Sequence, residues 1–258
     1  MKINELKYKV LESSYKSQLP HIGSALSCAD ILYCLYYKNI LKYLDFKNPN
    51  RDRFILSKGH AATILYCILD DLINNTNINL NTIATPNNCL EEHPSLNSIL
   101  GIEASTGALG HGIGIAVGLA LSAKIRKQSF NTYVLLGDGE CNEGSVWESV
   151  NFASSHNLNN LKIIIDNNNW QGTGRSLDIS TNNLKNQFEA FGCEVIEIAG
   201  HIHYEIISAL KKETFKPLCI IAKTIKGKDI SFMEDDNNWH YKIPNEDDIK
   251  KAKEELGL

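Results

Sequence analysis

Five short apolar segments constrain what this chain can fold into. Each is rich in β-branched residues, and segments with a helical pattern separate them. Their sequences are RFILS (53–57), TYVLL (132–136), LKIIID (161–166), CEVIEI (193–198) and PLCIIAK (217–223). Continuous apolar strands that alternate with helices are typical of a parallel sheet covered on both faces. We therefore expect an α/β fold: a doubly wound, mostly parallel sheet with helices on both faces, joined by right-handed crossovers.

The segments between these strands predict the helices. Ser27 followed by Asp30 has the spacing of a capping box ahead of an apolar helix. The Asn-rich stretch 74–88 has no clear period and predicts a loop or a frayed helix. Further helices are expected over 61–73, 110–128, 144–156, 182–191 and 203–212.

Composition excludes several classes of protein. The chain has 258 residues, of which 26 are basic and 30 acidic, giving a net charge of −4, so we expect no nucleic-acid partner. No apolar run approaches the ~18 residues that cross a bilayer, and the polar start MKINELKYKVLESS is unlike a signal peptide, so we expect no membrane partner. Since no Gly-, Pro- or Ser-rich linker divides the chain, we expect residues 1–258 to form a single domain.

The cysteines indicate a reducing compartment. There are seven, an odd number, and none forms a C-x-x-C pair, which argues against both a zinc site and a disulfide framework. Most lie in apolar segments, so we expect buried reduced thiols in a cytoplasmic protein.

Two polar loops follow neighbouring predicted strands. Gly137-Asp138-Gly139 ends the second strand, and Asn168 follows the third. Ligands of open parallel sheets bind beyond the carboxyl ends of the strands, so these loops are expected to lie side by side. A carboxylate, an amide oxygen and the Trp170 carbonyl are the oxygen ligands that Mg²⁺ takes, with room left for phosphate oxygens. Taken alone, a G-D-G is more often a structural turn, and each histidine is more often a surface or core residue.

The stretch GDGECNEGSVWESVNFASSHNLNNLKIIIDNNN closely resembles the thiamine diphosphate motif, and its filling resembles transketolase in particular. Other stretches match that family in the same order: LPHIGSALSCADILYCLYY, DRFILSKGHAATILYCIL, EEHPS, STGALGHGIGIAVGLALSAK and KTIKGKDISFMEDDNNWHYK. EEHPS resembles the family's GHPE-like loop. The resemblance covers roughly residues 10 to 255 and implies the fold of the family's diphosphate-binding domain.

The resemblance also implies site residues. Asp138, Asn168 and the Trp170 carbonyl would coordinate Mg²⁺ (or Ca²⁺ or Mn²⁺). Four histidines would line the channel to the reactive carbon of the cofactor, two near the diphosphate (His60 and His240) and two near the sugar (His21 and His93). Four further residues would contact thiamine diphosphate: Gly107, Leu109, Gly137 and Gly139. Glu143 would lie near the cofactor at a contact between subunits.

Three positions depart from the family pattern. Ile22 replaces the proline of an HPG motif, His111 replaces the glutamine of LGQG, and Tyr241 follows His240 where related proteins carry glycine. These changes affect the expected sugar contacts more than the expected metal ligands.

A full transketolase continues with a pyrimidine-binding domain, whose glutamate activates the cofactor, and with a third domain. The resemblance therefore implies that this chain is the N-terminal subunit of a split transketolase. In such an enzyme, a separate C-terminal subunit would complete a heterotetramer that transfers a two-carbon ketol unit between sugars or sugar phosphates. Two alternatives stay open: half of another thiamine diphosphate enzyme, deoxyxylulose-phosphate-synthase-like or 2-oxo acid dehydrogenase-like, and a non-catalytic module on the same fold.

Overall fold

A parallel sheet lies at the centre of the computed structural model, which describes residues 1–42, 45–73, 78–86, 88–96, 98–180 and 183–258. Its five strands have the order β1-β2-β3-β5-β4, and each neighbouring pair is parallel. The strands are β1 (Arg53–Leu56), β2 (Thr132–Gly137), β3 (Leu161–Asn167), β4 (Glu194–Ala199) and β5 (Leu218–Lys223). The predicted fold class is confirmed.

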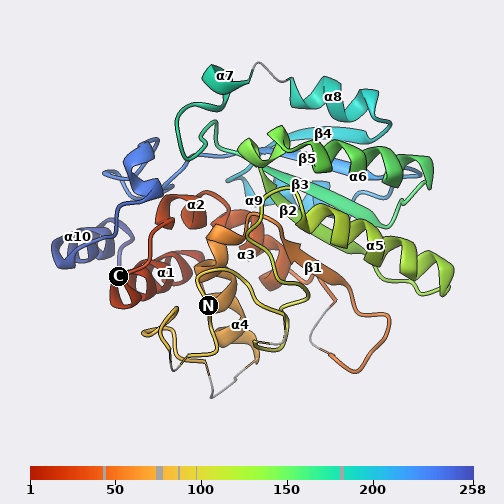
Figure 1. Ribbon diagram of the computed structural model, residues 1–258. Helices are drawn as coiled ribbons and strands as arrows, with labels where there is room; N and C mark the ends of the chain where they lie inside the picture. Colours follow the sequence, from red (N-terminus) through yellow and green to blue (C-terminus); the bar gives the residue numbers. More distant parts are fainter. Residues whose placement is uncertain (43–44, 74–77, 87, 97, 181–182) are drawn as a thin grey trace.

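Helices cover both faces of the sheet (Figure 1). One buried cluster joins the sheet to α5, α6 and α8, and a larger one joins it to α1 to α4, α9 and α10. The helices are α1 (Ile3–Ser17), α2 (Ile22–Ser27), α3 (Ala29–Tyr37), α4 (Ala62–Ile73), α5 (Gly112–Ile125), α6 (Gly144–Ser155), α7 (Ser176–Ile179), α8 (Leu184–Ala190), α9 (His203–Lys211) and α10 (Glu246–Glu255), with short 3₁₀ turns η1 (Gly59–Ala61), η2 (Gly139–Asn142) and η3 (Asn237–His240).

The strand residues explain this layering. Successive side chains of a strand point to opposite faces. In β2, Tyr133 and Leu135 belong to the larger cluster, whereas Val134 and Leu136 belong to the smaller one. Because both faces are buried, the strand reads as a continuous apolar run rather than as an alternating one.

Most element boundaries agree with the sequence patterns to within about two residues, a usual margin for helix ends. The capping box at Ser27 was wrong: α2 ends at Ser27 and α3 begins at Ala29. The Ser27 hydroxyl donates instead to Asp166 Oδ2 (2.5 Å) and to the Ser24 carbonyl. A buried acceptor from β3 thus competes successfully with the local cap. Of the predicted loop 74–88, residues 74–77 and 87 lie outside the described residues.

Two expectations from composition can be compared with the fold. In the part of the chain that the structure describes, no helix is long and apolar enough to cross a membrane. All seven cysteines are free thiols, and each is buried except Cys89.

Candidate functional site

The two predicted loops meet at the carboxyl edge of the sheet. Strands β2 and β3 pair in a register that sets Gly137 opposite Asp166, and the Asp138 N–H donates to the Asp166 carbonyl (3.2 Å). A pocket of about 260 Å³ opens there, which we call the strand-end pocket. Nine of the twelve predicted site residues line it: His60, Leu109, Gly137, Asp138, Gly139, Glu143, Asn168, Trp170 and His240.

The three predicted metal ligands lie together beside this pocket. Asp138 and Asn168 are both buried, and burial raises the pKa of Asp138 to about 6. Asp138 Oδ2 accepts from the Ser176 hydroxyl (2.6 Å), and Asn168 Oδ1 accepts from the Trp170 N–H (3.0 Å). Each acceptor keeps further lone pairs for a cation. Within the described residues, no three His, Cys, Asp or Glu side chains form a metal site, so a metal here would rely on amide, carbonyl and ligand oxygens.

The four predicted histidines form one cluster. The His21 ring centroid lies 5.0 Å from that of His240, 5.3 Å from that of His60 and 6.3 Å from that of His93. These residues come from the start of α2, from η1, from the loop before α5 and from η3, so tertiary folding alone brings them together. Gly107 lies against the His93 side chain and does not line the strand-end pocket. Its φ is +132°, and an added Cβ would come within 2.8 Å of the His93 ring.

A buried lysine that sequence reasoning missed links the cluster to the strands. Lys58 is 1% exposed and forms an ion pair with Asp166, which is fully buried. Its ammonium also donates to the Ser24 carbonyl (3.1 Å). Burial lowers the pKa of His60 well below its ordinary value, and the Lys58 charge adds to the effect, so His60 is neutral. The SKGH motif contains Lys58, but nothing local marks this lysine as buried.

A second missed lysine fixes the form of His240. Lys226 Nζ lies 2.9 Å from His240 Nδ1 and 2.8 Å from Asn237 Oδ1. Burial and the Lys226 charge lower the pKa of His240 to about 3. An ammonium only donates, so Nδ1 accepts and Nε2 carries the proton of the neutral ring. An added Cβ on Gly172 would lie 3.4 Å from this Nε2, which therefore faces a pocket-lining residue.

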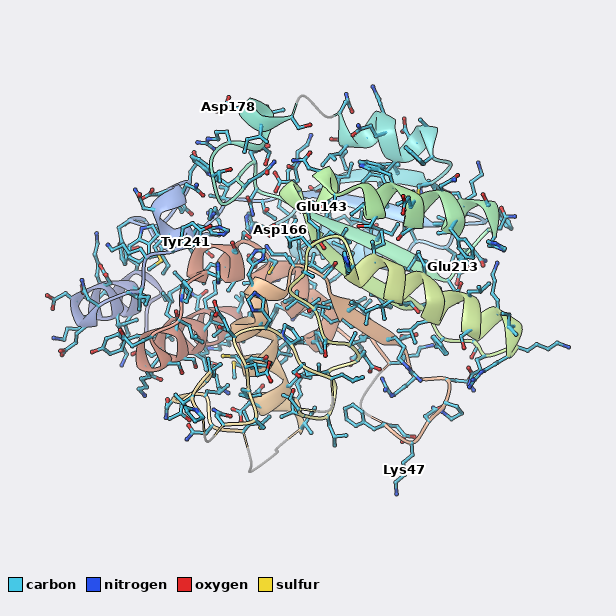
Figure 2. All side chains as sticks on the ribbon, viewed as in Figure 1. Lys47, Glu143, Asp166, Asp178, Glu213 and Tyr241 are labelled. Atoms are coloured by element: carbon cyan, nitrogen blue, oxygen red, sulfur yellow. The ribbon has the colours of Figure 1, made fainter. Side chains whose placement is uncertain are left out.

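Two glutamates in the GDG loop differ in their surroundings. Glu140 is buried and accepts from the Ser57 hydroxyl (2.5 Å), the Gly110 N–H (2.9 Å) and the Gly137 N–H (3.2 Å), while burial raises its pKa. Glu143, labelled in Figure 2, is exposed and lines the strand-end pocket. Glu140 thus holds the loop in place, and Glu143 faces outward.

The three departures from the family pattern lie in different places. Ile22 is buried in α2. His111 is exposed at the start of α5, with Nδ1 3.1 Å from the Leu109 carbonyl. Tyr241, labelled in Figure 2, is 64% exposed and lines the strand-end pocket, and its ring centroid lies 4.7 Å from that of His240. Tyr241 is therefore the departure that meets the site directly.

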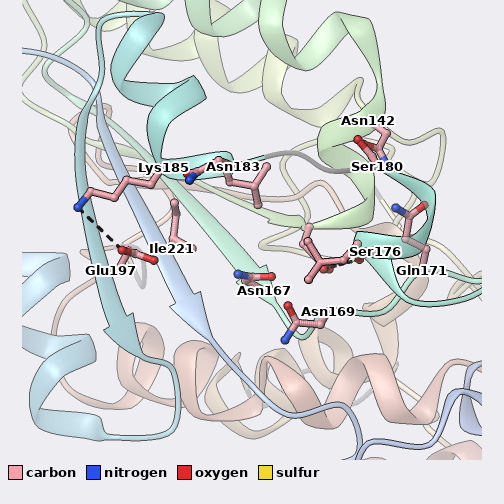
Figure 3. A pocket seen from close by; sticks show the side chains of 13 residues that line it. Asn142, Asn167, Asn169, Gln171, Ser176, Ser180, Asn183, Lys185, Glu197 and Ile221 are labelled. Atoms are coloured by element: carbon pink, nitrogen blue, oxygen red, sulfur yellow. Dashed lines mark hydrogen bonds and ion pairs between the residues drawn. The ribbon is translucent and has the colours of Figure 1, made fainter.

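A second, larger pocket of about 360 Å³ adjoins the first (Figure 3). It shares Asp138, Asn142 and Gln171 with the strand-end pocket, but its other walls are mainly amide and hydroxyl side chains with the Lys185–Glu197 ion pair (3.9 Å). None of the predicted histidines lines it. His60, His240, Lys58 and the predicted metal ligands converge on the smaller pocket instead.

Comparisons with known proteins identify the family. The family model "Transketolase, thiamine diphosphate binding domain" matches residues 2–258. An apulose-4-phosphate transketolase subunit of Phocaeicola vulgatus is 36% identical over 253 residues, covering 96% of this chain and 90% of that protein. The protein of the same name from Actinobacillus succinogenes is 41% identical over 240 residues, covering 92% and 87%.

A solved structure matches as well. The transketolase of Campylobacter jejuni superposes with a TM-score of 0.91 at 36% identity, covering 99% of this chain and 42% of that one. The chain thus spans about two fifths of the length of that full transketolase.

The fold, with its strand-end pocket, and the family match together define a thiamine diphosphate-binding domain. The chain belongs to the transketolase family. Within that family it corresponds to the N-terminal subunit of a split transketolase, because nearly all of it aligns with nearly all of two proteins that are themselves transketolase subunits. The predicted family and function are confirmed.

Proposed function

We propose that the strand-end pocket holds the diphosphate of thiamine diphosphate on a Mg²⁺ ion and that the complete enzyme transfers a two-carbon ketol unit between sugars. One observation carries this proposal: Asp138 and Asn168 lie at the ends of adjacent strands, beside a cluster of four histidines. The bound cofactor supplies the carbanion chemistry at its thiazolium ring.

The donor set of the pocket fits this cofactor. Carboxylate, amide and carbonyl oxygens suit a hard cation, and the ammonium groups of Lys58 and Lys226 provide positive charge for the diphosphate. Gly139 leaves no room for a side chain, because an added Cβ would lie 2.6 Å from Gln171 Cγ. In the proposal, Asp138, Asn168 and the Trp170 carbonyl bind the metal, and Gly137 and Gly139 contact the diphosphate. Leu109 packs beside the cofactor.

The histidines would handle protons and orient the sugar. His240, neutral with Nε2–H as donor, would donate a hydrogen bond into the pocket, and neutral His60 would act beside it. His21 and His93 would contact the hydroxyl and carbonyl groups of the sugar. Imidazole is suited to such transfers near neutral pH.

A partner would complete the site. We propose a C-terminal subunit with a pyrimidine-binding domain, two copies of each chain in a heterotetramer, and Glu143 at the contact between subunits. Residues 1–258 would act as a single domain in this assembly. Apulose 4-phosphate, which the names of the two relatives contain, is the first donor to test. The buried free thiols suit the cytoplasmic location that we propose.

The test is ketol transfer by the purified chain, by its co-purified partner and by the two mixed, each with Mg²⁺ and thiamine diphosphate. We expect transfer only from the mixture. Equal activity of the chain alone would overturn the split-enzyme proposal, and a mixture that binds no thiamine diphosphate would overturn the cofactor assignment.

A further inference from the structure

His21 occupies an unusual position in the cluster. It precedes α2 in the left-handed region, with φ 69° and ψ 14°. Its backbone N–H donates to the His240 carbonyl (2.9 Å), which ties the two residues together. Its ring is also within 6.3 Å of the other three histidine rings, centroid to centroid. A non-glycine residue at positive φ marks a place where the surrounding structure holds the backbone in a sparsely populated conformation.

The Nδ1 atom of this ring lacks a hydrogen bond. It is buried, and no partner in the described part of the chain satisfies hydrogen-bond geometry. Glu92 Oε1 nevertheless lies 3.4 Å away, on a side chain that is 42% exposed and free to adjust. Catalytic hydrogen bonds are often long before substrate binds and tighten afterwards. A small rotation of the Glu92 side chain would complete a hydrogen bond between His21 Nδ1 and Glu92 Oε1.

Glu92 is also the residue that distinguishes this loop. The loop reads Glu91-Glu92-His93-Pro94, and Glu92 stands where the resembled GHPE-like loop has glycine. A glycine offers no side chain, so the carboxylate beside His21 belongs to this sequence rather than to that pattern.

The charges around His21 give this carboxylate a clear effect. Burial is the main cause that lowers the pKa of His21, and His93, Lys226 and Lys58 lower it further. Glu92 acts in the opposite direction and raises the pKa.

Three more titratable groups face this ring. His60 and His240 are neutral, and the Tyr241 ring lies 6.0 Å away, centroid to centroid. Glu92 therefore offsets the positive charges of Lys58 and Lys226 near this ring.

We propose that Glu92 is a positioning residue that makes His21 a base for a substrate hydroxyl. This inference rests on the proposed function of the site. A carboxylate only accepts, so it selects the tautomer with Nδ1–H and leaves Nε2 as the acceptor. The substrate O–H bond then breaks, its electron pair stays on oxygen, and the proton bonds to Nε2. Glu92 offsets the positive charge that develops on the ring.

The first test needs no activity. Long-range ¹H–¹⁵N NMR of the full chain, with His21 assigned from a His21→Asn variant, reports the tautomer and the pKa of this ring. We expect the Nδ1–H tautomer in the unmodified chain, a lower His21 pKa in Glu92→Gln, and loss of the tautomer preference in Glu92→Ala. An unchanged tautomer and pKa in Glu92→Ala would overturn the proposal.

The second test uses the complex with the C-terminal partner. In Glu92→Gln we expect kcat to fall by about tenfold. This is less than the ~10²–10⁴-fold that a general base contributes to the rate, because His21 itself remains. The acid limb of the pH–rate profile should move to lower pH. Glu91→Gln, the same charge change one residue away, should leave kcat and the pH–rate profile unchanged. An effect of Glu92→Gln on KM alone would refute the positioning role. If the complex shows no ketol transfer but the NMR couplings hold, the proposed function fails and the Glu92–His21 pairing stands.

Discussion

Asp30 is a buried carboxylate that contacts side chains from distant parts of the chain. It accepts from Lys7 Nζ (2.9 Å), and the ring nitrogens of His201 and His203 lie 3.0 and 2.8 Å from its oxygens. Burial alone would raise its pKa. The hydrogen bonds from His201, Lys7 and His203 and the Lys7 charge outweigh burial and hold the pKa of Asp30 well below its ordinary value.

This arrangement predicts a pH-dependent contribution to stability. A depressed carboxyl pKa stabilises the fold above the unfolded-state value of about 3.9, and the contribution is lost as pH falls toward the folded-state pKa. Asp30→Asn should lower the free energy of unfolding by about 3 kcal/mol at pH 7, because buried Lys7 then keeps only Asp229 as a charged partner. The difference from the unmodified protein should shrink below about pH 4. Urea unfolding across this range measures it.

A matched control is Asp70→Asn, since Asp70 pairs with Lys9 at a half-buried site (2.6 Å). We expect a change below about 1 kcal/mol there. A difference for Asp30→Asn that stays constant with pH would contradict the assignment.

The proposed metal ligand Asp138 gives a second prediction at this scale. Removal of a ligand should weaken binding by more than the 10–100-fold typical of outer-shell changes. For Asp138→Ala we expect thiamine diphosphate affinity, measured by calorimetry with Mg²⁺ and the partner, to fall by at least about 100-fold, roughly 3 kcal/mol. Asp178→Ala, in nearby α7, serves as the control. Unchanged affinity in Asp138→Ala would refute the metal assignment.

Individual residues differed in how far the sequence could place them. Asp138 and Asn168 could be predicted, because strand ends and glycines mark them. Lys58 and Lys226 could not, since burial of a lysine depends on acceptors contributed by other elements. Ser27 was misread for the same reason: its hydroxyl meets Asp166 from β3 rather than its own helix.

At the scale of elements, three side chains connect the loop after β3 to the segment before η3. The Trp170 indole donates to Asp235 Oδ1 (2.8 Å), and Arg175 forms two hydrogen bonds with the same carboxylate (2.7 and 2.6 Å). The Arg175 guanidinium also lies 3.7 Å from the centroid of the Trp170 ring. These contacts fix the loop that carries the Trp170 carbonyl, although they lie at the surface.

We therefore expect Asp235→Asn to weaken metal binding modestly. Exposed ion pairs and cation–π contacts are worth about 1 kcal/mol, which corresponds to about a fivefold loss of affinity. Electron paramagnetic resonance of Mn²⁺ in the presence of thiamine diphosphate would measure it. Asp247→Asn, whose side chain is 94% exposed on α10, should change nothing. If Asp235→Asn binds Mn²⁺ as tightly as the unmodified protein, the loop holds its shape without Asp235.

The order of strands along the chain was predictable, but their order in space was not. The apolar runs identified β1 to β5, yet the exchange of β4 and β5 at the edge depends on which helices fit between them. Likewise, α1 and α10 were not predicted, although both pack on the larger buried cluster. Their polar sequences, such as EDDIKKAKEE in α10, conceal the few buried residues that attach them.

At the scale of the whole molecule, the proposed division of the cofactor site between two chains has a thermodynamic consequence. A ligand stabilises only the state that binds it, by about 2.7 kcal/mol at 100 times its Kd. For the assembled complex this predicts a rise in melting temperature of roughly 5–10 °C with saturating thiamine diphosphate and Mg²⁺. The isolated chain should shift by less than about 2 °C at the same concentrations, because the partner's contacts to the cofactor are missing. Differential scanning fluorimetry, with a chelator in place of Mg²⁺ as control, measures both. A full shift in the isolated chain would mean that its own residues, beginning with Asp138, Asn168 and the two buried lysines, suffice to bind the cofactor.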